Sequence, residues 1–314
     1  MSVVSIVENS MDAGFYGEAG ARINMVGPVL ARELGGKTVK LAIDGGFTCP
    51  NRDGRAGYGG CSFCSAAGSG DNASDIDSQI ELLGGKWKAD NYIAYFQSFT
   101  GTYAPAEELR EKYCSALSHP GIKGIAVATR PDCLPDDVMD LLSEIRRDHY
   151  MWIELGLQTA RDDVAESFGR GYPLSVYNEA AEKLRSRGIR FVTHIILGLP
   201  GETHDDMLRS ALHACQAGSW GLKLHLLNMI KGTRMAEEHP GYVPFDSPEE
   251  YMDLVCDILE RIPPEVVIHR LSADAKAEDL IAPKWAYRKR LLINGINKNL
   301  AGRGTRQGSK FNGF

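Results

Sequence analysis

Several features that would place this chain in a membrane or outside the cell are missing from its sequence. No apolar run approaches the roughly eighteen residues that a transmembrane helix needs. The first residues, MSVVSIVENSMDAGF, lack the basic stretch followed by an apolar one that marks a signal peptide. Hydrophobic residues make up 43% of the chain and charged residues 24%, as in ordinary globular proteins. We therefore expect a cytoplasmic globular protein with no membrane partner.

The chain also has no linker rich in proline or serine, no low-complexity tract and no repeat of solenoid length. Its seven cysteines are an odd number, and four of them are scattered singly: Cys114, Cys133, Cys215 and Cys256. Because the cytosol keeps thiols reduced, a disulfide framework is not expected. A length of 314 residues suits one large α/β domain or two smaller ones.

Acidic residues are absent from the last part of the chain. Residues 284–314 contain eight Lys and Arg and no Asp or Glu, so the net charge of −6 leaves −14 for the remainder. A basic segment on an acidic body suits a polyanion bound at one place, and nucleic acid is the obvious candidate. A solvated basic helix without a partner is the alternative. The candidate nucleic-acid contacts are Lys284, Arg288, Lys289, Arg290, Arg303, Arg306 and Lys310.

Short β-rich runs alternate with longer helical patterns along the chain. The expected strands are residues 38–44, 92–99, 124–130, 151–157, 189–197 and 222–229. The expected helices are residues 105–118, 135–148, 175–187, 203–217 and 247–261. This alternation predicts parallel strands joined by helical crossovers, and the nearly continuous apolar strands fit a sheet covered by helices.

Unusual polar segments follow the ends of the first five strands, and they favour a barrel over an open sheet. In chain order they are DGGFTCP, TGTY, RPDC, QTA and GLPGE. Barrel enzymes build the active site from such loops, whereas an open sheet concentrates them at one switch point. We therefore predict an α/β fold, a partial (β/α)6 barrel of the TIM type with a basic C-terminal extension. The expected division is an N-terminal extension over residues 1–36, a core over 37–235 and a helical and basic extension over 236–314.

The glycine-rich segment GFTCPNRDGRAGYGGCSFCSAAGSGD, residues 46–71, contains Cys49, Cys61 and Cys64. Three thiols this close suit a metal or an iron–sulfur cluster, and the glycines let the backbone wrap closely around a bulky inorganic core. A redox pair formed by CSFC would leave Cys49 unexplained. Three purely structural thiols would not be expected to gather among glycines.

A structural zinc site needs a fourth ligand, most often Cys or His. None is near this segment in the sequence, because the next cysteine is Cys114 and the first histidine is His119. Three ligands with a vacant fourth position explain the pattern better.

Three cysteines in the loop after the first strand, with the aromatic Phe63 just before the last, resemble the radical S-adenosylmethionine (SAM) superfamily. The eleven residues between the first two cysteines exceed the commonest spacing and resemble the branch that includes the Elongator catalytic subunit. More closely, several segments between about residue 40 and residue 309 resemble the YhcC/YtqA family. These segments are LAIDGGFTCPNRDG, GGCSFCSAAGSGD, TRPDCLPD, IELGLQTA, GLPGET, HRLSAD, LIAPKW and RGTRQGS.

This resemblance implies that Cys49, Cys61 and Cys64 bind three irons of a [4Fe-4S] cluster, whose fourth iron takes the amino and carboxylate groups of SAM. It also implies that an electron from the cluster splits SAM into methionine and a 5′-deoxyadenosyl radical, which takes a hydrogen atom from the substrate. Phe63 is a further cofactor contact on this basis.

Other cofactor contacts follow from the same resemblance. Thr100, Gly101 and Thr102 correspond to residues that contact the amino group of SAM, although a plain turn also explains them. Gln158 and Arg170 correspond to the pair that holds the ribose and the carboxylate, and the Arg fork suits a carboxylate. A helix cap at Gln158 and a solvated Arg170 are the alternatives.

Gly198 and Leu199 correspond to an adenine-facing turn, or they simply end a strand. Relatives often carry a carboxylate near the end of the third strand, where this chain has Ala128. Cys133 in the same loop is the candidate catalytic residue, with an ordinary packed thiol as the alternative. The histidines of two strands, His194 and His225, are interpreted first as core residues and second as cofactor contacts.

The resemblance links the chain to tRNA modification, in which a 5-carboxymethylaminomethyl group on the wobble uridine becomes 5-aminomethyl. WAYRKRLLINGINKNL predicts a helix with Arg288, Lys289 and Arg290 in solvent, and GRGTRQGSK after it could follow a phosphate backbone. A small-molecule or protein substrate, and a non-catalytic iron–sulfur or zinc protein, are the open alternatives. The expected partners are tRNA and a reductant such as flavodoxin or ferredoxin.

Overall fold

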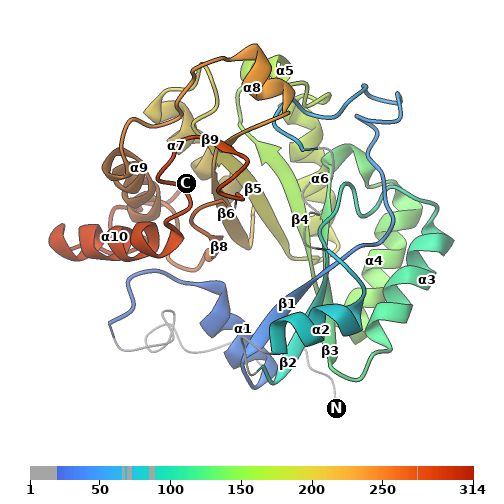
Figure 1. Cartoon of the computed structure of the whole chain (residues 1–314). Helices are drawn as coiled ribbons and strands as arrows, with labels where there is room; N and C mark the ends of the chain where they lie inside the picture. Colours follow the sequence, from blue (N-terminus) through green and yellow to red (C-terminus); the bar gives the residue numbers. More distant parts are fainter. Residues whose placement is uncertain (1–19, 66–67, 69–72, 85–88, 274) are drawn as a thin grey trace.

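A computed structural model describes residues 20–65, 68, 73–84, 89–273 and 275–314 (Figure 1). Its centre is a parallel sheet of seven strands in the order β1-β2-β3-β4-β5-β6-β8. The strands are β1 (Thr38–Ile43), β2 (Asn91–Phe96), β3 (Ile122–Thr129), β4 (Tyr150–Gln158), β5 (Phe191–Leu197), β6 (Gly221–Leu226) and β8 (Val267–Arg270). A separate antiparallel pair consists of β7 (Met229–Ile230) and β9 (Leu280–Ala282).

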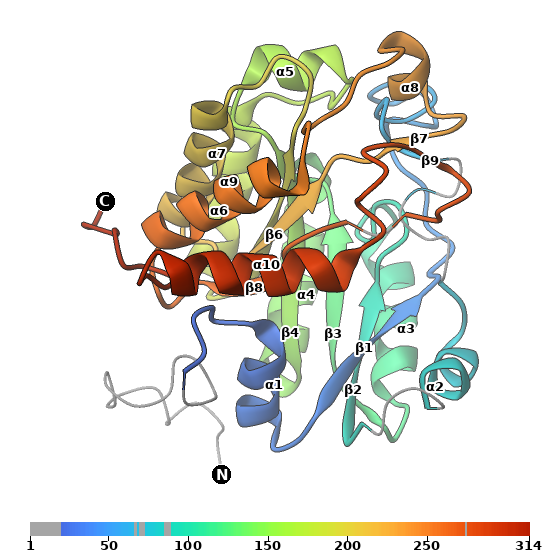
Figure 2. The same cartoon turned by 60° about the vertical axis from the view of Figure 1, so that its left-hand side comes forward.

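Helices cover the outside of this curled sheet (Figures 1 and 2). They are α1 (Val26–Leu34), α2 (Ile76–Gly84), α3 (Ala106–Leu117), α4 (Asp136–Asp148), α5 (Asp162–Ser167), α6 (Leu174–Ser186), α7 (His204–Gln216), α8 (Arg234–Glu238), α9 (Pro248–Arg261) and α10 (Lys289–Gly302). A short 3-10 turn, η1, spans Pro131–Cys133. The predicted α/β fold, a partial barrel of the TIM type, is confirmed, as are the six predicted strands and the five predicted helices.

The sequence did not predict the seventh strand, β8. Its four residues VIHR are too few to give a periodic signal, and β8 pairs with β6 through Gly221 and Val267. Between the two edge strands of the sheet, β1 and β8, lies α1, which packs against both. The helix therefore covers one end of the opening that a complete barrel would close.

Side chains from α1 and the inner face of the sheet fill the lower part of the barrel. Leu30 of α1 packs there with inward-facing residues of four strands, among them Tyr95, Ala128 and Trp152. The larger apolar cluster lies on the other face, between the sheet and the surrounding helices. Because the interior is packed below, the space for a site lies above it, toward the C-terminal ends of the strands.

The C-terminal segment packs on the barrel. In α10 the residues Leu292, Ile296 and Leu300 are buried, and the helix lies along α9 (Figure 2). Gln307 then links both ends of the described chain, because its Nε2 donates to the Val266 carbonyl oxygen at 2.7 Å and its Oε1 accepts from the Asn24 amide at 3.0 Å. The division near residue 235 stays a prediction, and β8 from the predicted extension is a strand of the central sheet.

Among the described residues, no helix combines the length and the apolar character that a membrane span requires.

Candidate active site

The loop after β1 turns back on itself around the first cysteine. The carbonyl oxygen of Cys49 accepts from the backbone of Arg52 at 2.8 Å, and that of Cys61 accepts from the amide of Cys64 at 2.9 Å. Gly54 has a φ of 93°, and a Cβ there would lie 2.5 Å from the Tyr58 hydroxyl. A side chain does not fit at this turn, which explains one of the glycines among the cysteines.

The cysteine loop is attached to the segment between β4 and α6. The amide Nδ2 of Asn51 donates to the Gly169 carbonyl oxygen at 2.7 Å and lies 3.4 Å from the sulfur of Cys61. The backbone amide of Ser62 donates to the carbonyl oxygen of Phe168 at 2.9 Å. These bonds hold the three cysteines over the C-terminal end of the sheet.

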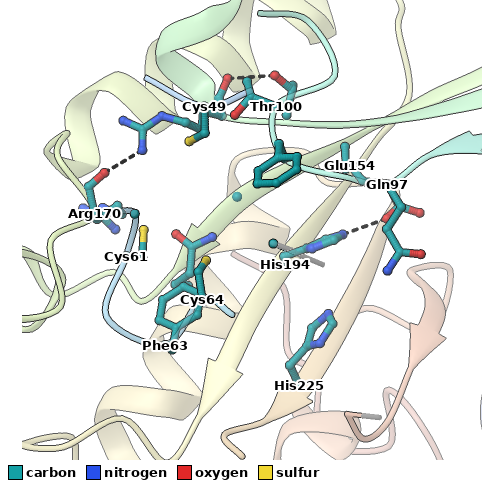
Figure 3. A pocket seen from close by; sticks show the side chains of 18 of the residues that line it. Cys49, Cys61, Phe63, Cys64, Gln97, Thr100, Glu154, Arg170, His194 and His225 are labelled. Carbon is teal, nitrogen blue, oxygen red and sulfur yellow. Dashed lines mark hydrogen bonds and ion pairs between the residues drawn. The ribbon is translucent and has the colours of Figure 1, made fainter. Parts of the chain in front are cut away.

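All three cysteines line one pocket, together with residues from the ends of several strands (Figure 3). The end of the pocket beside the thiols also contains Arg52, Phe63, Phe99 and Thr100. The opposite end is polar and is formed by Tyr95, Glu154, His194, Lys223, His225 and Arg270. Small residues, Ala128 and Gly156, lie in the wall as well. We call these two regions the thiol end and the polar end.

The thiol end has the chemistry of a cluster site. A hydrogen bond from Cys64 lowers the pKa of Cys61 to about 7, and Asn51 acts in the same direction while burial opposes both. The same bond between the thiols, with burial, raises the pKa of Cys64. Among the described residues, no three His, Cys, Asp or Glu side chains surround a single ion. A [4Fe-4S] cluster binds each thiolate through a different iron, so three thiols around one pocket fit that group.

Glu154 organises the polar end. Its Oε1 accepts from Lys40 Nζ at 3.3 Å and from Trp152 Nε1 at 3.2 Å. Its Oε2 accepts from the Tyr95 hydroxyl at 2.5 Å and from Lys223 Nζ. Burial alone would raise the pKa of this carboxyl, but the positive charges of Lys223 and Lys40 outweigh it and hold the pKa well below its usual range. Glu154 is therefore ionised although its side chain is completely buried.

His194 completes this arrangement, since its Nε2 lies 2.8 Å from Glu154 Oε2. Burial, with the nearby charge of Lys223, lowers the pKa of His194 to about 4, so the ring is neutral near pH 7. Because Glu154 is ionised, Nε2 carries the hydrogen and donates it. His225 lies beside this ring with the two centroids 5.2 Å apart, and burial lowers its pKa too.

The structure brings together many of the residues that the sequence predicted as site residues. Those that line the pocket are Cys49, Cys61, Phe63, Cys64, Thr100, Gln158 and Arg170. The other cofactor candidates do not line it. Gly101 donates its backbone amide to Ala128 at 2.7 Å, Thr102 bonds to the Cys133 carbonyl oxygen at 2.5 Å, and Leu199 lies in an apolar cluster. At Gly198, Pro244 and Phe245 pack where a Cβ would lie.

Cys133, the candidate catalytic residue, also lies outside this lining. It is buried, with its thiol 3.7 Å from Asp132 Oδ1. Burial and the neighbouring carboxylate raise the pKa of the thiol. In this position Cys133 has the environment of a packed thiol, and a catalytic role for it stays a prediction.

Arg170 lies at the pocket wall, but its guanidinium bonds to the protein itself. Its Nη1 donates to the carbonyl oxygens of Leu157 at 2.8 Å and Thr159 at 2.7 Å, and its Nε donates to that of Tyr172 at 2.9 Å. Its Nη2 pairs with Asp162 at 2.8 Å. These contacts hold the end of β4 in place and differ from the solvated position that was the alternative.

Most of the polar end was not predicted from the sequence. Glu154 and Lys223 lie inside the apolar strand segments MWIELGL and LKLHLLNM, where a charged residue is unusual enough to signal a site. Glu154 is also the register partner of Ala128 on β3. Strand pairing therefore places a carboxylate beside Ala128, and that carboxylate is bonded to side chains of the protein.

Comparison with known proteins agrees with this site. Residues 49–214 match the Radical SAM superfamily, and residues 219–301 match the Radical_SAM C-terminal domain. Protein YtqA of Bacillus subtilis is 45% identical, over 94% of this chain and 95% of its own length. Protein YhcC of Escherichia coli is 40% identical, over 84% of this chain and 87% of its own length.

More distant relatives are similar to this chain over only part of its length, or only in fold. Elongator complex protein 3 of Drosophila melanogaster is 28% identical over 48% of this chain and 28% of its own length. The structure of the archaeal Methanocaldococcus infernus Elp3 has a TM-score of 0.60 at 16% identity and covers 73% of this chain and 58% of that chain. Methylornithine synthase (PylB) has a TM-score of 0.52 at 12% identity, over 86% and 82% of the two chains.

A partial barrel with three thiols above the C-terminal ends of its strands defines a radical SAM enzyme, and the chain belongs to the radical SAM superfamily. Within that superfamily it belongs to the family of YtqA and YhcC. The predicted family and cofactors, a [4Fe-4S] cluster and SAM, are therefore confirmed, and enzymes of this class need a reductant. When bound, the cluster and SAM supply a one-electron cleavage that leads to removal of a hydrogen atom from the substrate.

Proposed function

We propose that this enzyme modifies tRNA by converting the 5-carboxymethylaminomethyl group of the wobble uridine to 5-aminomethyl. The resemblance to the YhcC/YtqA family supports this proposal, because its matched segments extend over nearly the whole chain. Cys49, Cys61 and Cys64 would hold the cluster, and the polar end of the pocket would face the modified base. A base that stacks out of a single-stranded anticodon loop could reach such a pocket.

The observation that carries the proposal is the path of the basic segment. The strand pair β7–β9 lies at the end of the sheet where the pocket is formed, and residues 283–288 lead from it into α10 (Figures 1 and 2). Lys284, Arg288 and Arg290 are exposed along this path, and so is Tyr287. Exposed cations beside an aromatic ring are suited to a phosphate backbone and an unpaired base.

The rest of the predicted basic surface is partly neutralised within the protein. Arg303 pairs with Asp253 at 2.9 Å and with Asp257 at 3.1 Å, and Lys310 pairs with Glu260. We therefore propose that Lys284, Arg288 and Arg290 make the stronger tRNA contacts. Contacts by Lys289, Arg303, Arg306 and Lys310 are predictions from the sequence alone.

The test of this function uses protein reconstituted anaerobically with iron, sulfide, SAM and a strong reductant. Incubation with tRNA that carries 5-carboxymethylaminomethyluridine should yield 5-aminomethyluridine, detected by mass analysis of the nucleosides, together with 5′-deoxyadenosine. If 5′-deoxyadenosine forms while the tRNA nucleosides stay unchanged, this tRNA is the wrong substrate and the enzyme class is unaffected.

Binding gives a second measurement. Replacing Arg288 and Arg290 by Gln should weaken tRNA binding and reduce the slope of log K against log salt by about one unit per lost phosphate contact. The matched control replaces two exposed arginines of α4, Arg146 and Arg147, by Gln. Equal losses in both pairs would contradict the assignment of the basic segment.

A further inference from the structure

A row of side chains crosses the inner face of the sheet at the polar end. Strand pairing places Gly156 of β4 beside His194 of β5, His194 beside Lys223 of β6, and Lys223 beside Arg270 of β8. His225 follows Lys223 by two positions and so faces the same side. All five residues line the pocket that contains the three cysteines.

One position of this row, Gly156, has no side chain. A Cβ at Gly156 would lie 2.7 Å from Gln158 Nε2 and 3.3 Å from the Tyr172 hydroxyl. Ala128, on the next strand, is also small and lines the pocket. Figure 3 shows the cysteines on one side of this space and His194 and His225 on the other. A ligand can therefore lie across Gly156 with one part near the thiols and another at the row.

Among the described residues that line the pocket, Glu154 is the one carboxylate. Two ammonium groups, those of Lys40 and Lys223, bond to Glu154. Glu154 accepts from five donors in total, the others being Trp152, Tyr95 and His194, so its lone pairs are fully used. Glu154 thus fixes the row and has no capacity left for a ligand.

Donors remain on two side chains of the row. Burial lowers the pKa of Lys223, and the ionised Glu154 in contact with it opposes this shift. As the ammonium partner of that carboxylate, Lys223 has three hydrogens, of which two go to Glu154 and to the Tyr95 hydroxyl at 2.9 Å. His225 Nε2 is buried and has no hydrogen-bond partner among the described residues. The His225 ring is neutral because burial lowers its pKa, so Nε2 is a donor in the tautomer that carries its hydrogen there. A buried polar atom without a partner is costly, and an anion that accepts from Nε2–H would select this tautomer and remove that cost. Arg270 adds a further positive charge beside Lys223.

We propose that this row is a subsite for a carboxylate of the substrate, with Lys223 and His225 as hydrogen-bond donors and Arg270 as an additional charge. The inference rests on the proposed function, because the 5-carboxymethylaminomethyl group ends in a carboxylate whereas the product lacks one. A carboxylate at the row places the adjacent methylene over Gly156, between the row and the thiol end. The subsite therefore explains how the enzyme distinguishes the substrate, which has the carboxylate, from the product, which lacks it. It also explains why the methylene of the substrate lies toward the cofactors.

A small probe tests the subsite without tRNA. N-Benzylglycine carries the carboxymethylaminomethyl group on an aromatic ring, and benzylamine is the same molecule without the carboxymethyl part. Their affinities are compared by ligand-detected NMR with cluster-loaded protein and saturating SAM, so that the carboxylate site of SAM is already filled. The wild-type protein should prefer N-benzylglycine by about tenfold or more, as expected for charge-assisted hydrogen bonds.

Three variants separate the subsite from the general charge of the pocket. Lys223→Gln and His225→Phe should each reduce the preference at least severalfold, and cluster content and SAM affinity should stay at the wild-type level. Lys40→Gln is the matched control, because Lys40 bonds to the same carboxylate of Glu154 but does not line the pocket. It should keep the preference. Circular dichroism of each variant identifies any variant that fails to fold. If Lys223→Gln fails to fold, His225→Phe still tests the subsite.

The outcomes separate the subsite from the proposed function. A clear preference for N-benzylglycine with no reaction on tRNA would support the subsite and overturn the tRNA assignment. A wild-type protein without preference, or a preference that persists in both row variants, would overturn the subsite. The same comparison without SAM gives a further outcome. A preference for N-benzylglycine that is present without SAM and lost when SAM is added would also overturn the subsite, since the row would then bind SAM.

Discussion

Asn51 donates a hydrogen bond from its side-chain amide to the sulfur of Cys61, over 3.4 Å. The same nitrogen lies 2.7 Å from the carbonyl oxygen of Gly169 and 3.2 Å from that of Arg170. Asn51 is itself buried, so one amide connects a cysteine to the loop that follows β4. It positions the cysteine loop without being a ligand.

Replacing Asn51 by Ala should therefore reduce cluster retention while the cysteines remain. The change removes the donor to Cys61 and the nitrogen donor to the Gly169 carbonyl oxygen, at a cost of about 1–3 kcal/mol, whereas the Arg170 carbonyl oxygen keeps its bond from Arg130. We expect less iron and sulfide per chain after desalting, and a lower absorbance of the cluster, than in wild-type protein.

The control for this variant is Asn91→Ala. Asn91 is also buried and donates to a backbone oxygen, that of Leu34 at 3.1 Å, but it lies at the start of β2 away from the cysteines. It should lose stability and keep its iron. Equal iron loss in the two variants would mean that Asn51 acts only through overall stability.

The cysteine prediction itself has a direct test. Replacing Cys49, Cys61 or Cys64 by Ala should abolish cluster binding and SAM cleavage, because each removes one of three thiolates from the pocket. Cys114→Ala, at an exposed position of α3, is the control and should keep full iron content. Retained iron in any one of the three pocket variants would remove that cysteine from the ligand set.

Arg170 provides a case in which sequence and structure assign different roles. The resemblance predicts a contact with the SAM carboxylate, whereas the structure places its donors on Leu157, Thr159, Tyr172 and Asp162. We expect Arg170→Gln to destabilise the fold by about 3 kcal/mol, because buried carbonyl oxygens lose their donors. Chemical unfolding and SAM titration of the same variant distinguish the two roles. Unchanged stability with lost SAM binding would favour the contact with SAM.

How far the sequence predicted this fold depended on the length of each segment. The six longer strands were found because each is a nearly continuous apolar run, and five of the helices were found because each is long enough for a helical pattern to appear. β8 has four residues and β7 has two, which is too short for any period to appear. α1 was also missed, although its position between β1 and β8 is what closes the lower side of the sheet.

The thiol end of the site was predicted from the sequence and most of the polar end was not, because the two ends differ in how far apart their residues lie in the chain. Cys49, Cys61 and Cys64 are close in sequence, so their spacing alone indicated a cluster. Glu154 and Lys223 are 69 positions apart and meet only because β4, β5 and β6 are adjacent and in register. No local pattern contains that information. His194 and His225, interpreted first as core residues, line the pocket for the same reason.

We expect the lack of a side chain at Gly156, between the two ends of the pocket, to be needed for SAM binding. In Gly156→Ala the new methyl group would meet Gln158 Nε2 at 2.7 Å, so the Gln158 side chain must move. Since Gln158 is a predicted SAM contact, we expect SAM affinity to fall by about tenfold, equivalent to about 1.4 kcal/mol, with iron content unchanged. SAM titration of the cluster-loaded variant measures this. Gly27→Ala in α1, where nothing lies within 4 Å of the new atom, should bind SAM normally.

Glu202 gives a prediction about pH. Burial raises the pKa of its carboxyl from 4.5 to about 7, and the hydrogen bond that Glu202 Oε1 accepts from Thr159 at 2.5 Å only partly opposes this. Its other oxygen, Oε2, has no partner among the described residues. Because the folded pKa exceeds the unfolded one, the stabilising contribution is complete below pH 4.5 and is lost as the pH rises through about 7.

Glu202→Gln should remove this dependence, since Gln keeps an oxygen acceptor for Thr159 and carries no charge. At pH 8 we expect the variant to be more stable than wild type by on the order of 2 kcal/mol, or roughly 4 °C in unfolding temperature, and at pH 5 the two should be nearly equal. Thermal unfolding of cluster-loaded protein at both pH values measures the difference. Glu166→Gln, at an exposed position of α5, is the control and should change little between them. A Glu202→Gln advantage that is the same at pH 5 and pH 8 would show that the buried charge is not its cause.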